Sequence, residues 1–419
     1  MAEPSRPRRL RIAFLVYRGN PRCGGQGVYT RHLTRELTAL GHSVTVFSGQ
    51  PYPELEEGVE LVKVASLDLY REPDPFRVPR LSEFTSATDV LEFALMCTAG
   101  FPEPLTFSLR ARRLLARRRE DFDLVHDDQS LGRGIGGMIR DGWPVLATIH
   151  HPITVDRDLD LAHAESWQRR VSLRRWYGFV GMQARIARRV PRVVTVSESS
   201  RRDIAAQLGV APGRIAVIPV GVDCSVFRPM AGVARVPGRI MTTASSDVPM
   251  KGLVPLLEAL AKLRSETSDA HLVVVGRLRD KSNVPAVLDR LGLASSVRFV
   301  SGVSDEEIVE LYASAQVAVV PSLYEGFSLP AIEAMACGVA LVATTGGALP
   351  EVAGPNGAAA LLVEPNDPGA LAQAIATVLS DESMRLRLGV AGRKRVSERF
   401  TWAVTARATA EQYFELLAC

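Results

Sequence analysis

Apolar runs of four to eight residues alternate with amphipathic stretches along almost the whole chain. A short continuous apolar run is typical of a strand that is buried on both faces of a sheet. The longer amphipathic stretches are typical of helices that cover such a sheet. The alternation therefore predicts repeated βα units around parallel sheets.

In the first half of the chain, this pattern predicts helices over 27–40 and 198–208, which end at Gly41 and Gly209. Glycine commonly follows the last turn of a helix because it adopts the left-handed conformation without strain. The strands predicted here are 11–17, 43–48, 124–126, 144–149, 193–196 and 215–222.

A segment rich in proline, glycine and small residues, 229–238, interrupts the pattern, which then starts again. The predicted second-half strands are 239–244, 271–275, 297–300, 317–321 and 341–343, and the predicted helices are 254–264, 305–314 and 329–337. We therefore predict an α/β protein of two doubly wound, Rossmann-like domains, residues 1–228 and 229–402. Ligands of such sheets bind at the carboxyl ends of the strands, so we expect them in a central cleft between the domains.

Residues 68–110 depart from the pattern because they carry many prolines and several aromatic residues. We interpret this segment as an insertion near the mouth of the cleft. Residues 154–189 are expected to form one or two long helices beside the cleft, which interleave aromatic residues with arginines. Such a helix suits either docking on a membrane surface or simple packing against its own domain.

The chain has 419 residues, 47% of them hydrophobic, and a formal net charge of only +4. This length favours two domains, and the small charge argues against a dedicated nucleic-acid-binding protein. Residues 101–200 are more basic, with 17 Arg against 12 Asp and Glu. The arginines form either a solvated helix face or a surface for an anionic partner, such as a phosphorylated substrate or a membrane.

The five cysteines show no paired spacing and no nearby histidines, which fits a reducing cytoplasm without disulfides or a zinc site. The basic start of the chain leads into an apolar run that is too short for a secretory signal. No apolar run reaches 18 residues, so we expect no membrane span. We therefore expect a cytoplasmic protein.

A glycine-rich turn, Cys23-Gly24-Gly25-Gln26-Gly27, joins the first predicted strand to the first helix. Such a turn lets the backbone approach a phosphate group, so Gly24 and Gly25 are candidate donor-binding residues. A tight turn without a ligand is the alternative. The spacing is not that of dinucleotide-binding enzymes, and Ser48 stands where those enzymes have an acidic residue.

Two carboxylates, Glu325 and Glu333, are separated by the segment Gly326-Phe327-Ser328-Leu329-Pro330-Ala331-Ile332. The first follows a predicted strand and the second lies one turn into the next helix. A carboxylate can accept hydrogen bonds from two neighbouring hydroxyl groups of a sugar. We expect Glu325 to face a hexose and Glu333 a ribose.

These residues resemble the family-4 retaining glycosyltransferases of GT-B fold. The resemblance covers nearly the whole chain and includes the glycine-rich turn, the Glu-x7-Glu element and four further segments. These are Val196-Ser197-Glu198-Ser199, Ile218-Pro219-Val220-Gly221-Val222-Asp223, Gly346-Gly347 with Glu351, and Phe400-Thr401-Trp402. The resemblance implies that residues 403–419 form a helix that returns to the first domain.

The resemblance also implies a role for Lys251, which matches a lysine that holds the donor diphosphate. The family usually has an arginine a few residues earlier, where this chain has Ser245 and Ser246. These hydroxyls can donate hydrogen bonds but bring no charge, so we expect Arg277 to supply a second cation. Gly326, Phe327, Ser328 and Leu329 complete the expected donor site.

His150 ends a predicted strand and matches a histidine that the family places near the reacting sugar. The resemblance implies a retaining, front-face reaction in which the leaving phosphate takes the proton of the acceptor. The expected catalytic residues are His150, Lys251 and Glu325. The Asp127-Asp128 pair lacks the spacing of a metal-binding motif, and we expect it to be solvated or to cap a helix, with a contact to the acceptor as the alternative.

The sequence thus predicts an enzyme that moves a hexose-type sugar from a nucleotide-sugar, with a UDP-sugar expected, to a hydroxyl acceptor without metal or cofactor. A membrane lipid is the alternative to a soluble acceptor. A non-catalytic nucleotide-sugar-binding or scaffold protein of the same fold is the competing function. Within the fold, a phosphorylase-like enzyme or a sucrose-type synthase would need extra length or a cofactor-binding lysine signature.

Overall fold

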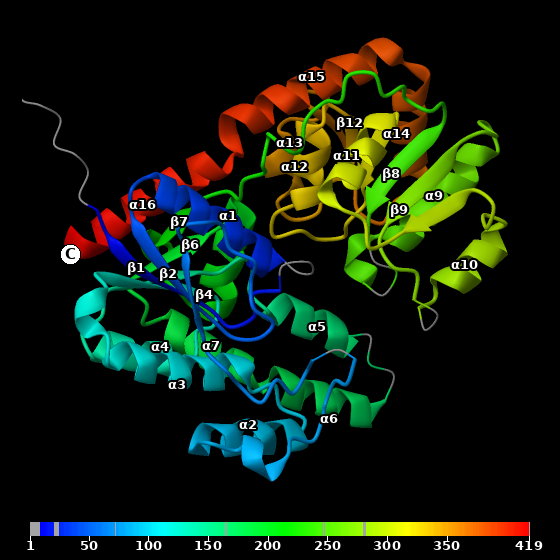
Figure 1. Ribbon diagram of the computed structural model, residues 1–419. Coiled ribbons are helices and arrows are strands. Elements are labelled where there is room, and N and C mark those ends of the chain that lie inside the picture. The colour runs from blue at the N-terminus through cyan, green and yellow to red at the C-terminus, as the bar shows by residue number, and fades with distance from the viewer. Residues whose placement is uncertain are drawn as a thin grey trace, which may run out of the picture. The chain divides into compact units, whose positions relative to one another are not determined.

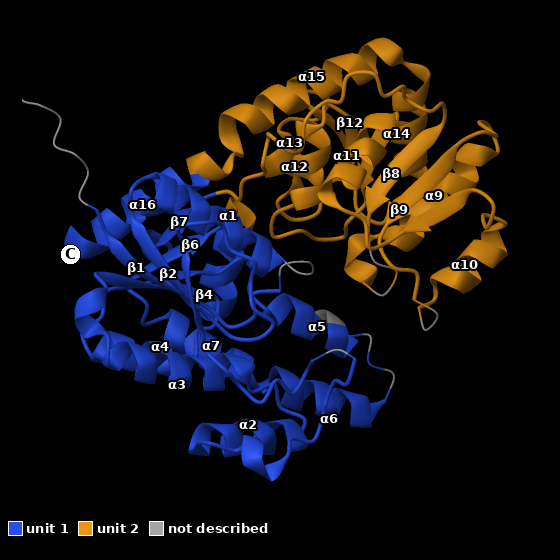
Figure 2. Cartoon of the chain, viewed as in Figure 1, with its two compact units in different colours: residues 1–196, 200–218, 405–419 blue, residues 197–199, 219–404 orange. Residues whose placement is uncertain are grey.

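The computed structural model describes residues 9–20, 25–71, 73–162, 164, 166–244, 246, 248–279 and 282–418. The chain forms two compact units, coloured separately in Figure 2. Unit 1 comprises residues 1–196, 200–218 and 405–419, and unit 2 comprises residues 197–199 and 219–404. The main division therefore follows Ile218 rather than residue 228. Val222 and Phe227 explain the difference, because both are buried in the core of unit 2.

Unit 1 contains a seven-stranded parallel sheet in the order β3-β2-β1-β4-β5-β6-β7 (Figure 1). Its strands are Arg11–Val16 (β1), Ser43–Ser48 (β2), Glu60–Lys63 (β3), Leu124–Asp128 (β4), Val145–Thr148 (β5), Arg192–Thr195 (β6) and Ile215–Val217 (β7). The strand order reverses direction between β1 and β4, which places their carboxyl ends beside each other at Val16 and Asp128.

Helices cover both faces of this sheet, with α3, α4 and α7 on one face and α1 and α16 on the other (Figure 1). Residues of α3, α4 and α7 share one apolar cluster with β1, β4 and β5. The helices are Gly25–Ala39 (α1), Ala87–Cys97 (α2), Glu103–Ala116 (α3), Arg133–Arg140 (α4), Thr154–Ala162 (α5), Trp167–Trp176 (α6), Val180–Ala187 (α7), Glu198–Asp203 (α8) and Trp402–Ala418 (α16).

The last helix, α16, ends in unit 1. Its Tyr413 is fully buried, and the Tyr413 hydroxyl lies 2.6 Å from Nδ1 of His126 on β4. Gln412 accepts a hydrogen bond of 2.6 Å from Arg192 at the start of β6. The C-terminal residues thus complete the packing of the first sheet.

Residues 68–110, interpreted from the sequence as an insertion near the mouth of the cleft, contain α2 and part of α3, and α3 belongs to the layer that covers the sheet. The insertion itself stays a prediction. A buried ion pair holds these helices together: Arg110 of α3 lies 2.5 Å from both Asp89 and Glu92 of α2.

The segment 154–189 does not form one or two long helices, because it is divided into α5, α6, a short 3-10 helix over Tyr177–Phe179, and α7. The rings of Trp176, Tyr177 and Phe179 are half-buried. Trp176 and Phe179 both lie against Phe101, with ring centroids 5.0 and 5.4 Å apart. Packing against its own domain therefore accounts for these rings, whereas Trp167 is exposed.

Unit 2 contains a six-stranded parallel sheet in the order β10-β9-β8-β11-β12-β13. Its strands are Arg239–Thr243 (β8), His271–Val275 (β9), Val297–Val300 (β10), Val317–Val320 (β11), Ala340–Thr344 (β12) and Ala360–Val363 (β13). The strand order reverses direction between β8 and β11, so a doubly wound sheet places a ligand-binding crevice at their carboxyl ends.

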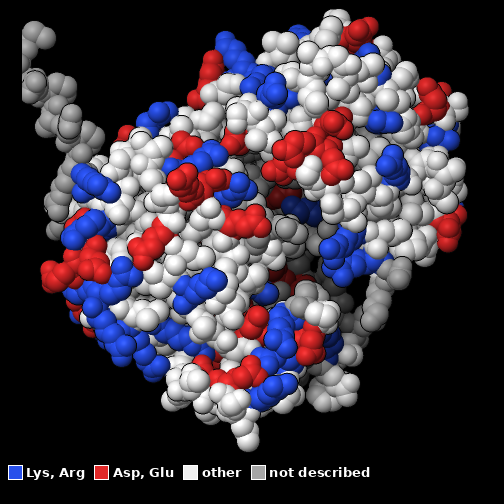
Figure 3. Space-filling model, in the orientation of Figure 1, with Lys and Arg blue, Asp and Glu red and all other residues white. Residues whose placement is uncertain are grey.

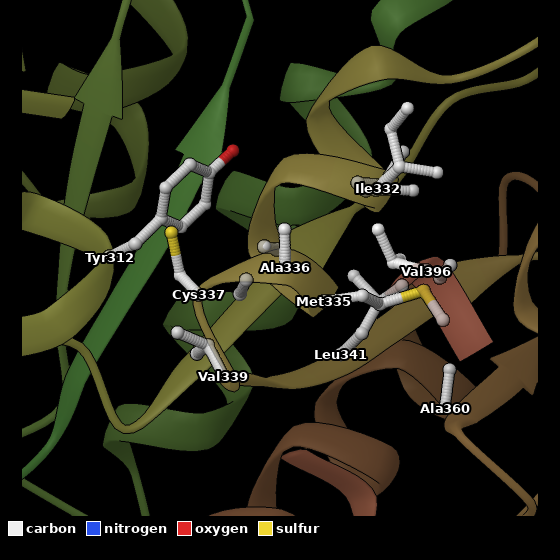
Figure 4. Packing of buried hydrophobic residues seen from close by; sticks show 14 of the residues in the cluster. Tyr312, Ile332, Met335, Ala336, Cys337, Val339, Leu341, Ala360 and Val396 are labelled. Carbon is white, nitrogen blue, oxygen red and sulfur yellow. The ribbon is translucent and has the colours of Figure 1, made fainter. Parts of the chain in front are cut away.

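One apolar cluster contains residues of α11, α12 and α13, and a second contains residues of α9, α10 and α14, so helices cover both faces. Figure 4 shows Ile332, Met335 and Ala336 of α12 packed with Leu341 of β12 and Val396 of α15. The helices are Leu253–Arg264 (α9), Val284–Leu291 (α10), Asp305–Ser314 (α11), Leu329–Ala336 (α12), Leu349–Ala353 (α13), Pro368–Ser380 (α14) and Glu382–Arg399 (α15). Within the described residues, no helix has the length and apolarity needed to span a bilayer.

Candidate functional site

The carboxyl ends of β8 and β11 in unit 2 bring together Lys251 and Glu325. The Nζ atom of Lys251 lies 2.8 Å from Oε1 of Glu325, which also accepts a hydrogen bond of 2.8 Å from the Ser322 hydroxyl. Glu325 is buried, whereas the Lys251 side chain is 35% exposed. The second carboxylate oxygen of Glu325 has no hydrogen-bond partner among the described residues. This pair therefore presents one open cation and one free acceptor oxygen.

Backbone contacts fix the two turns that carry this pair. The amide of Leu323 donates to the carbonyl of Met250 at 2.8 Å. Gly252 has a φ of +67°, and a Cβ atom at this position would lie 1.9 Å from the carbonyl oxygen of Pro321. Only glycine tolerates both this conformation and this close approach. The Met250-Lys251-Gly252 segment is thus held against the loop that contains Glu325.

Ser246, which follows β8, joins this turn to the neighbouring turn after β9. Its hydroxyl donates to the carbonyl of Arg277 at 3.0 Å and accepts from the amide of Arg279 at 2.7 Å. The Ser246 hydroxyl hydrogen is therefore engaged in a hydrogen bond within the protein. The donor contacts expected of Ser246 and Arg277 stay predictions, and Ser245 lies outside the described residues.

The Gly326–Leu329 segment connects Glu325 to α12. Phe327 packs against Phe400 with ring centroids 5.8 Å apart, and Leu329 begins the helix. Ser328 precedes the helix, and its buried hydroxyl oxygen has no partner among the described residues. An unsatisfied buried hydroxyl is costly, so Ser328 is suited to receive a hydrogen bond from a ligand.

Glu333 lies one turn into α12 and is half-buried. Burial raises the pKa of the Glu333 carboxyl to about 7, with a smaller contribution from the negative charge of Asp305, while a hydrogen bond from Tyr312 lowers it. Glu333 makes no contact with Lys251 or Glu325 among the hydrogen bonds of the described residues. It is therefore a separate acceptor group, near the point where it changes between its neutral and charged forms at neutral pH.

In unit 1, His150 follows β5 and pairs with the last residue of β4. Its Nε2 lies 2.8 Å from Oδ1 of Asp128, and its ring stands edge-on to Tyr29 of α1 with centroids 4.8 Å apart. The His150 amide donates to Gln129 at 2.8 Å, which fixes the backbone. Asp128 is fully buried, and its Oδ2 has no partner in the part of the chain that the structure describes. A buried carboxylate beside Nε2 favours a proton on that nitrogen and leaves Nδ1 for another contact.

A buried chain of polar groups, which the sequence did not reveal, continues behind His150. The Thr148 hydroxyl lies 2.7 Å from Nε2 of His126 and 3.2 Å from the Tyr29 hydroxyl. Burial lowers the pKa of His126 to about 3, so this ring is neutral at physiological pH. The position of these residues on adjacent predicted strands was the signal available, since β4 and β5 are neighbours.

The prediction that Asp127-Asp128 is solvated or caps a helix is wrong, because both side chains are fully buried and the N-cap of α4 is Gly132, without a side-chain hydrogen bond. Asp127 accepts hydrogen bonds from the Ser130 hydroxyl and, at 2.8 Å, from the Leu131 amide. It thereby stabilises the turn before α4. Burial raises the pKa of Asp127 to about 7.

The glycine-rich turn lies only partly within the described residues, since Gly24 is outside them. Gly25 begins α1 and has open space where a Cβ atom would stand. At Gly27 a Cβ atom would lie 1.9 Å from the carbonyl oxygen of Asn20, so this glycine is required by packing. The described residues contain no group of three or more His, Cys, Asp or Glu arranged to hold a metal ion.

Comparisons with known proteins cover nearly the entire chain. Residues 23–226 match the model of Glycosyltransferase Family 4, and residues 234–395 match that of Glycosyl transferases group 1. The chain is 52% identical over 410 residues to the MMP alpha-(1->4)-mannosyltransferase of Mycolicibacterium hassiacum, covering 98% of this chain and 99% of the relative. It is 28% identical to a D-inositol 3-phosphate glycosyltransferase of Kineococcus radiotolerans, covering 95% and 92%.

Solved structures support the same fold. A sucrose-phosphate synthase of Thermosynechococcus elongatus has a TM-score of 0.74 at 24% identity and covers 98% of this chain and 100% of its own. Anabaena Alr3699/HepE in complex with UDP-glucose has a TM-score of 0.69 at 18% identity, covering 97% and 100%. The two parallel, doubly wound sheets and these likenesses identify the fold as GT-B. The chain belongs to glycosyltransferase family 4 and is a glycosyltransferase.

Proposed function

We propose that this chain is a retaining mannosyltransferase that uses a nucleoside diphosphate mannose and forms an α-(1→4) linkage. The observation that carries the proposal is the Lys251–Glu325 pair at the strand-order reversal of unit 2. The choice of mannose and linkage rests on the printed activity of the relative that is 52% identical. A 1→4 linkage requires a sugar ring as the acceptor, because its O4 hydroxyl becomes the glycosidic oxygen.

Lys251 is the proposed ligand of the donor diphosphate. Its ammonium group lies 2.8 Å from Oε1 of Glu325, and about a third of the side chain is exposed. A diphosphate that enters the crevice competes for this cation. Glu325 then keeps the hydrogen bond from Ser322 and can accept hydrogen bonds from two hydroxyls of the mannosyl ring. When Lys251 exchanges Glu325 for the diphosphate, Lys251 binds the phosphate side of the reacting bond and Glu325 binds the mannosyl side.

The chemical step balances without a protein nucleophile. The bond from C1 of the mannose to the phosphate oxygen breaks, and the bond from C1 to the acceptor O4 forms on the same face. The O4 proton passes to the leaving phosphate oxygen. Lys251 stabilises the negative charge that develops on this phosphate, and such electrostatic stabilisation contributes most to enzymes of this type.

The acceptor is expected on unit 1, where His150 is positioned by Asp128 and Tyr29. With Nε2 facing Asp128, Nδ1 of His150 can accept a hydrogen bond from a sugar hydroxyl. The buried Oδ2 of Asp128 has no partner among the described residues, which suits a second hydroxyl contact. Of the aromatic residues on which the alternative of a lipid acceptor depended, Trp176 and Phe179 are half-buried against Phe101, whereas Trp167 is exposed. A lipid therefore stays the alternative acceptor.

The test is to incubate the full chain with mannobiose and with GDP-mannose, UDP-mannose or UDP-glucose, which includes the UDP-sugar expected from the sequence. Mass spectrometry detects the transferred hexose, and proton NMR gives the linkage and anomeric configuration. We expect an α-(1→4)-mannosyl product from one mannose donor. Transfer of glucose alone, or a β-linked product, would contradict the proposal.

A matched pair of variants links the product to the crevice. Lys251→Ala should abolish most of the transfer, whereas Lys262→Ala removes an exposed lysine from the end of α9 and should not. Binding of the donor without any transfer to any of several mannosides would favour the competing function, a nucleotide-sugar-binding scaffold.

A further inference from the structure

A pocket of about 190 Å³ lies in unit 1 between α4 and α7, away from the residues assigned to catalysis. Arg133 and Arg140 of α4 and Arg185 of α7 line it, together with Arg189 just beyond α7. The remaining lining residues are small or apolar: Gly136, Met182 and Ile186. The helices pack closely here, because a Cβ atom on Gly136 would lie 2.6 Å from Ile186.

Of the four arginines, only Arg140 lies close enough to a described carboxylate, Asp141, to lower its pKa. All four are exposed, and none forms a hydrogen bond or ion pair through its side chain with another described residue. Neither α4 nor α7 contains an Asp or Glu. The carboxylate that follows α4, Asp141, is bound to Arg112 by two hydrogen bonds of 2.8 and 3.0 Å. The pocket therefore has a concentrated positive charge.

The arginines that line a larger pocket in unit 2 are, in contrast, hydrogen-bonded within the protein. That pocket, of about 820 Å³, is lined among others by Arg235, Arg385 and Arg393. Each of these guanidinium groups donates to backbone carbonyls, as Arg393 does to Phe227 and Ala336 at 2.8 Å. Those arginines stabilise the fold, and their N–H groups already donate to backbone carbonyls.

Favourable interactions with helix dipoles explain the positions of only some of the four arginines in unit 1. Arg140 and Arg185 lie in the last turns of α4 and α7, where a cation interacts favourably with the helix dipole. Arg133 is the first residue of α4, where the same dipole disfavours a cation. The side chain of Arg133 forms no hydrogen bond or ion pair with another described residue that would stabilise it beside three further arginines.

We propose that this pocket binds the phosphate group of a small soluble anion, either a phosphate monoester or a diphosphate. Guanidinium groups bind phosphate oxygens through paired hydrogen bonds, and four of them can neutralise a multiply charged ligand. A soluble ligand is favoured over a lipid head group because no large apolar side chain of α4 or α7 is among the exposed ones, so the helices lack a membrane anchor.

The basic residues near this pocket belong to a wider charged surface. Figure 3 shows Lys and Arg side chains gathered over the face of unit 1 that carries α3 and α4. Such a surface raises the local concentration of anions and speeds their association. The proposal does not depend on mannosyl transfer, since none of these residues belongs to the candidate catalytic site.

The probe is inorganic pyrophosphate, titrated calorimetrically at low salt. Pyrophosphate should also bind at Lys251, so the experiment uses the Lys251→Ala chain as its background. In this background, Arg133→Gln with Arg185→Gln should weaken pyrophosphate binding about tenfold or more, as expected for the loss of two charge-assisted contacts. Arg169→Gln with Arg174→Gln is the matched control, because it removes the same charge from exposed arginines of α6.

Unchanged affinity in the Arg133/Arg185 variant, or equal losses in both double variants, would overturn the proposal. So would an absence of pyrophosphate binding in the Lys251→Ala background. A second arm uses vesicles of phosphatidylcholine alone or with equal parts of phosphatidylglycerol. Sedimentation with the anionic vesicles that depends on Arg133 and Arg185, without pyrophosphate binding, would overturn the soluble ligand in favour of a lipid head group.

Discussion

In unit 2 the lysine at the carboxyl edge of the sheet is partly open to solvent, whereas the two aspartates at the end of β4 in unit 1 are fully buried. Lys251 is 35% exposed and pairs with Glu325 across two turns. Asp127 and Asp128 are fully buried. An open ion pair can exchange its partner for a charged ligand at low cost, while a buried network keeps its geometry.

This difference suggests that unit 2 binds and releases the donor, whereas unit 1 orients the acceptor. The donor brings two negative charges, and an open cation that changes partners suits its binding and release. The proposed acceptor is an uncharged sugar ring that has to be oriented, and a histidine held by a buried carboxylate suits orientation. If this comparison is correct, variants in unit 2 should change the chemical step most, and variants in unit 1 should have smaller effects.

The largest effect is expected for Lys251→Ala. Loss of the cation that stabilises the leaving phosphate should lower kcat/KM about 30- to 1000-fold, equivalent to roughly 2–4 kcal/mol. Circular dichroism should show an intact fold, because the side chain is partly exposed. Lys262→Ala is the control. Turnover close to that of the unmodified chain would remove Lys251 from the site.

A smaller effect is expected for Asp128→Asn, which tests the buried network of unit 1. The amide keeps the shape of the carboxylate but removes the charge that fixes His150. Loss of a charge-assisted hydrogen bond should lower kcat/KM about tenfold, or roughly 1.4 kcal/mol. The exposed Asp158→Asn is the matched control. If both variants are equally active, Asp128 has a structural role only.

The sequence predicted the parts of the fold in which local pattern and burial agree. The strands of unit 2 are continuous apolar runs, and β9 and β10 have the predicted bounds. Strand β3 was missed because it is a half-exposed edge strand that begins with Glu60 and ends with Lys63. The predicted strand 215–222 ends at Val217, because Val222 instead bridges to Thr401.

The candidate site, too, could be predicted only where a local sequence pattern marks it. The Glu325–Glu333 spacing and Lys251 could be found because they belong to short sequence motifs. The buried state of Asp128 depends on strands far apart in the sequence, since β4 lies between β1 and β5. The arginine pocket was also missed, because α4 was not predicted and the pocket forms only where α4 meets α7.

A moderate, pH-dependent effect is expected for Glu333. Burial raises the pKa of this carboxyl to about 7, so its charged fraction rises from about a tenth at pH 6 to about nine-tenths at pH 8. The sequence predicts that Glu333 binds the donor ribose, and a charged carboxylate accepts hydrogen bonds from two hydroxyls better than a neutral carboxyl does. The KM for the donor should therefore fall several-fold between pH 6 and 8.

Glu333→Gln should have a raised donor KM that no longer changes with pH, and Glu333→Ala should impair donor use further. The measurement is the initial rate as a function of donor concentration across this pH range. A pH dependence that persists in Glu333→Gln would show that another group titrates. Asp127 is the first alternative, since its pKa is also raised to about 7.

The smallest effect is expected from metal removal. An enzyme that neutralises the donor diphosphate with a divalent ion loses its activity in excess chelator, because the ion supplies the charge at the leaving phosphate. In this chain Lys251 is placed to supply that charge, and the described residues contain no group of three or more His, Cys, Asp or Glu to hold an ion. We therefore expect kcat/KM to change less than about twofold in excess EDTA. A magnesium-dependent glycosyltransferase in the same buffer checks that the chelator is effective. Loss of activity that magnesium or manganese restores would mean that Lys251 does not act alone, and that the open edge of unit 2 also recruits an ion together with the donor.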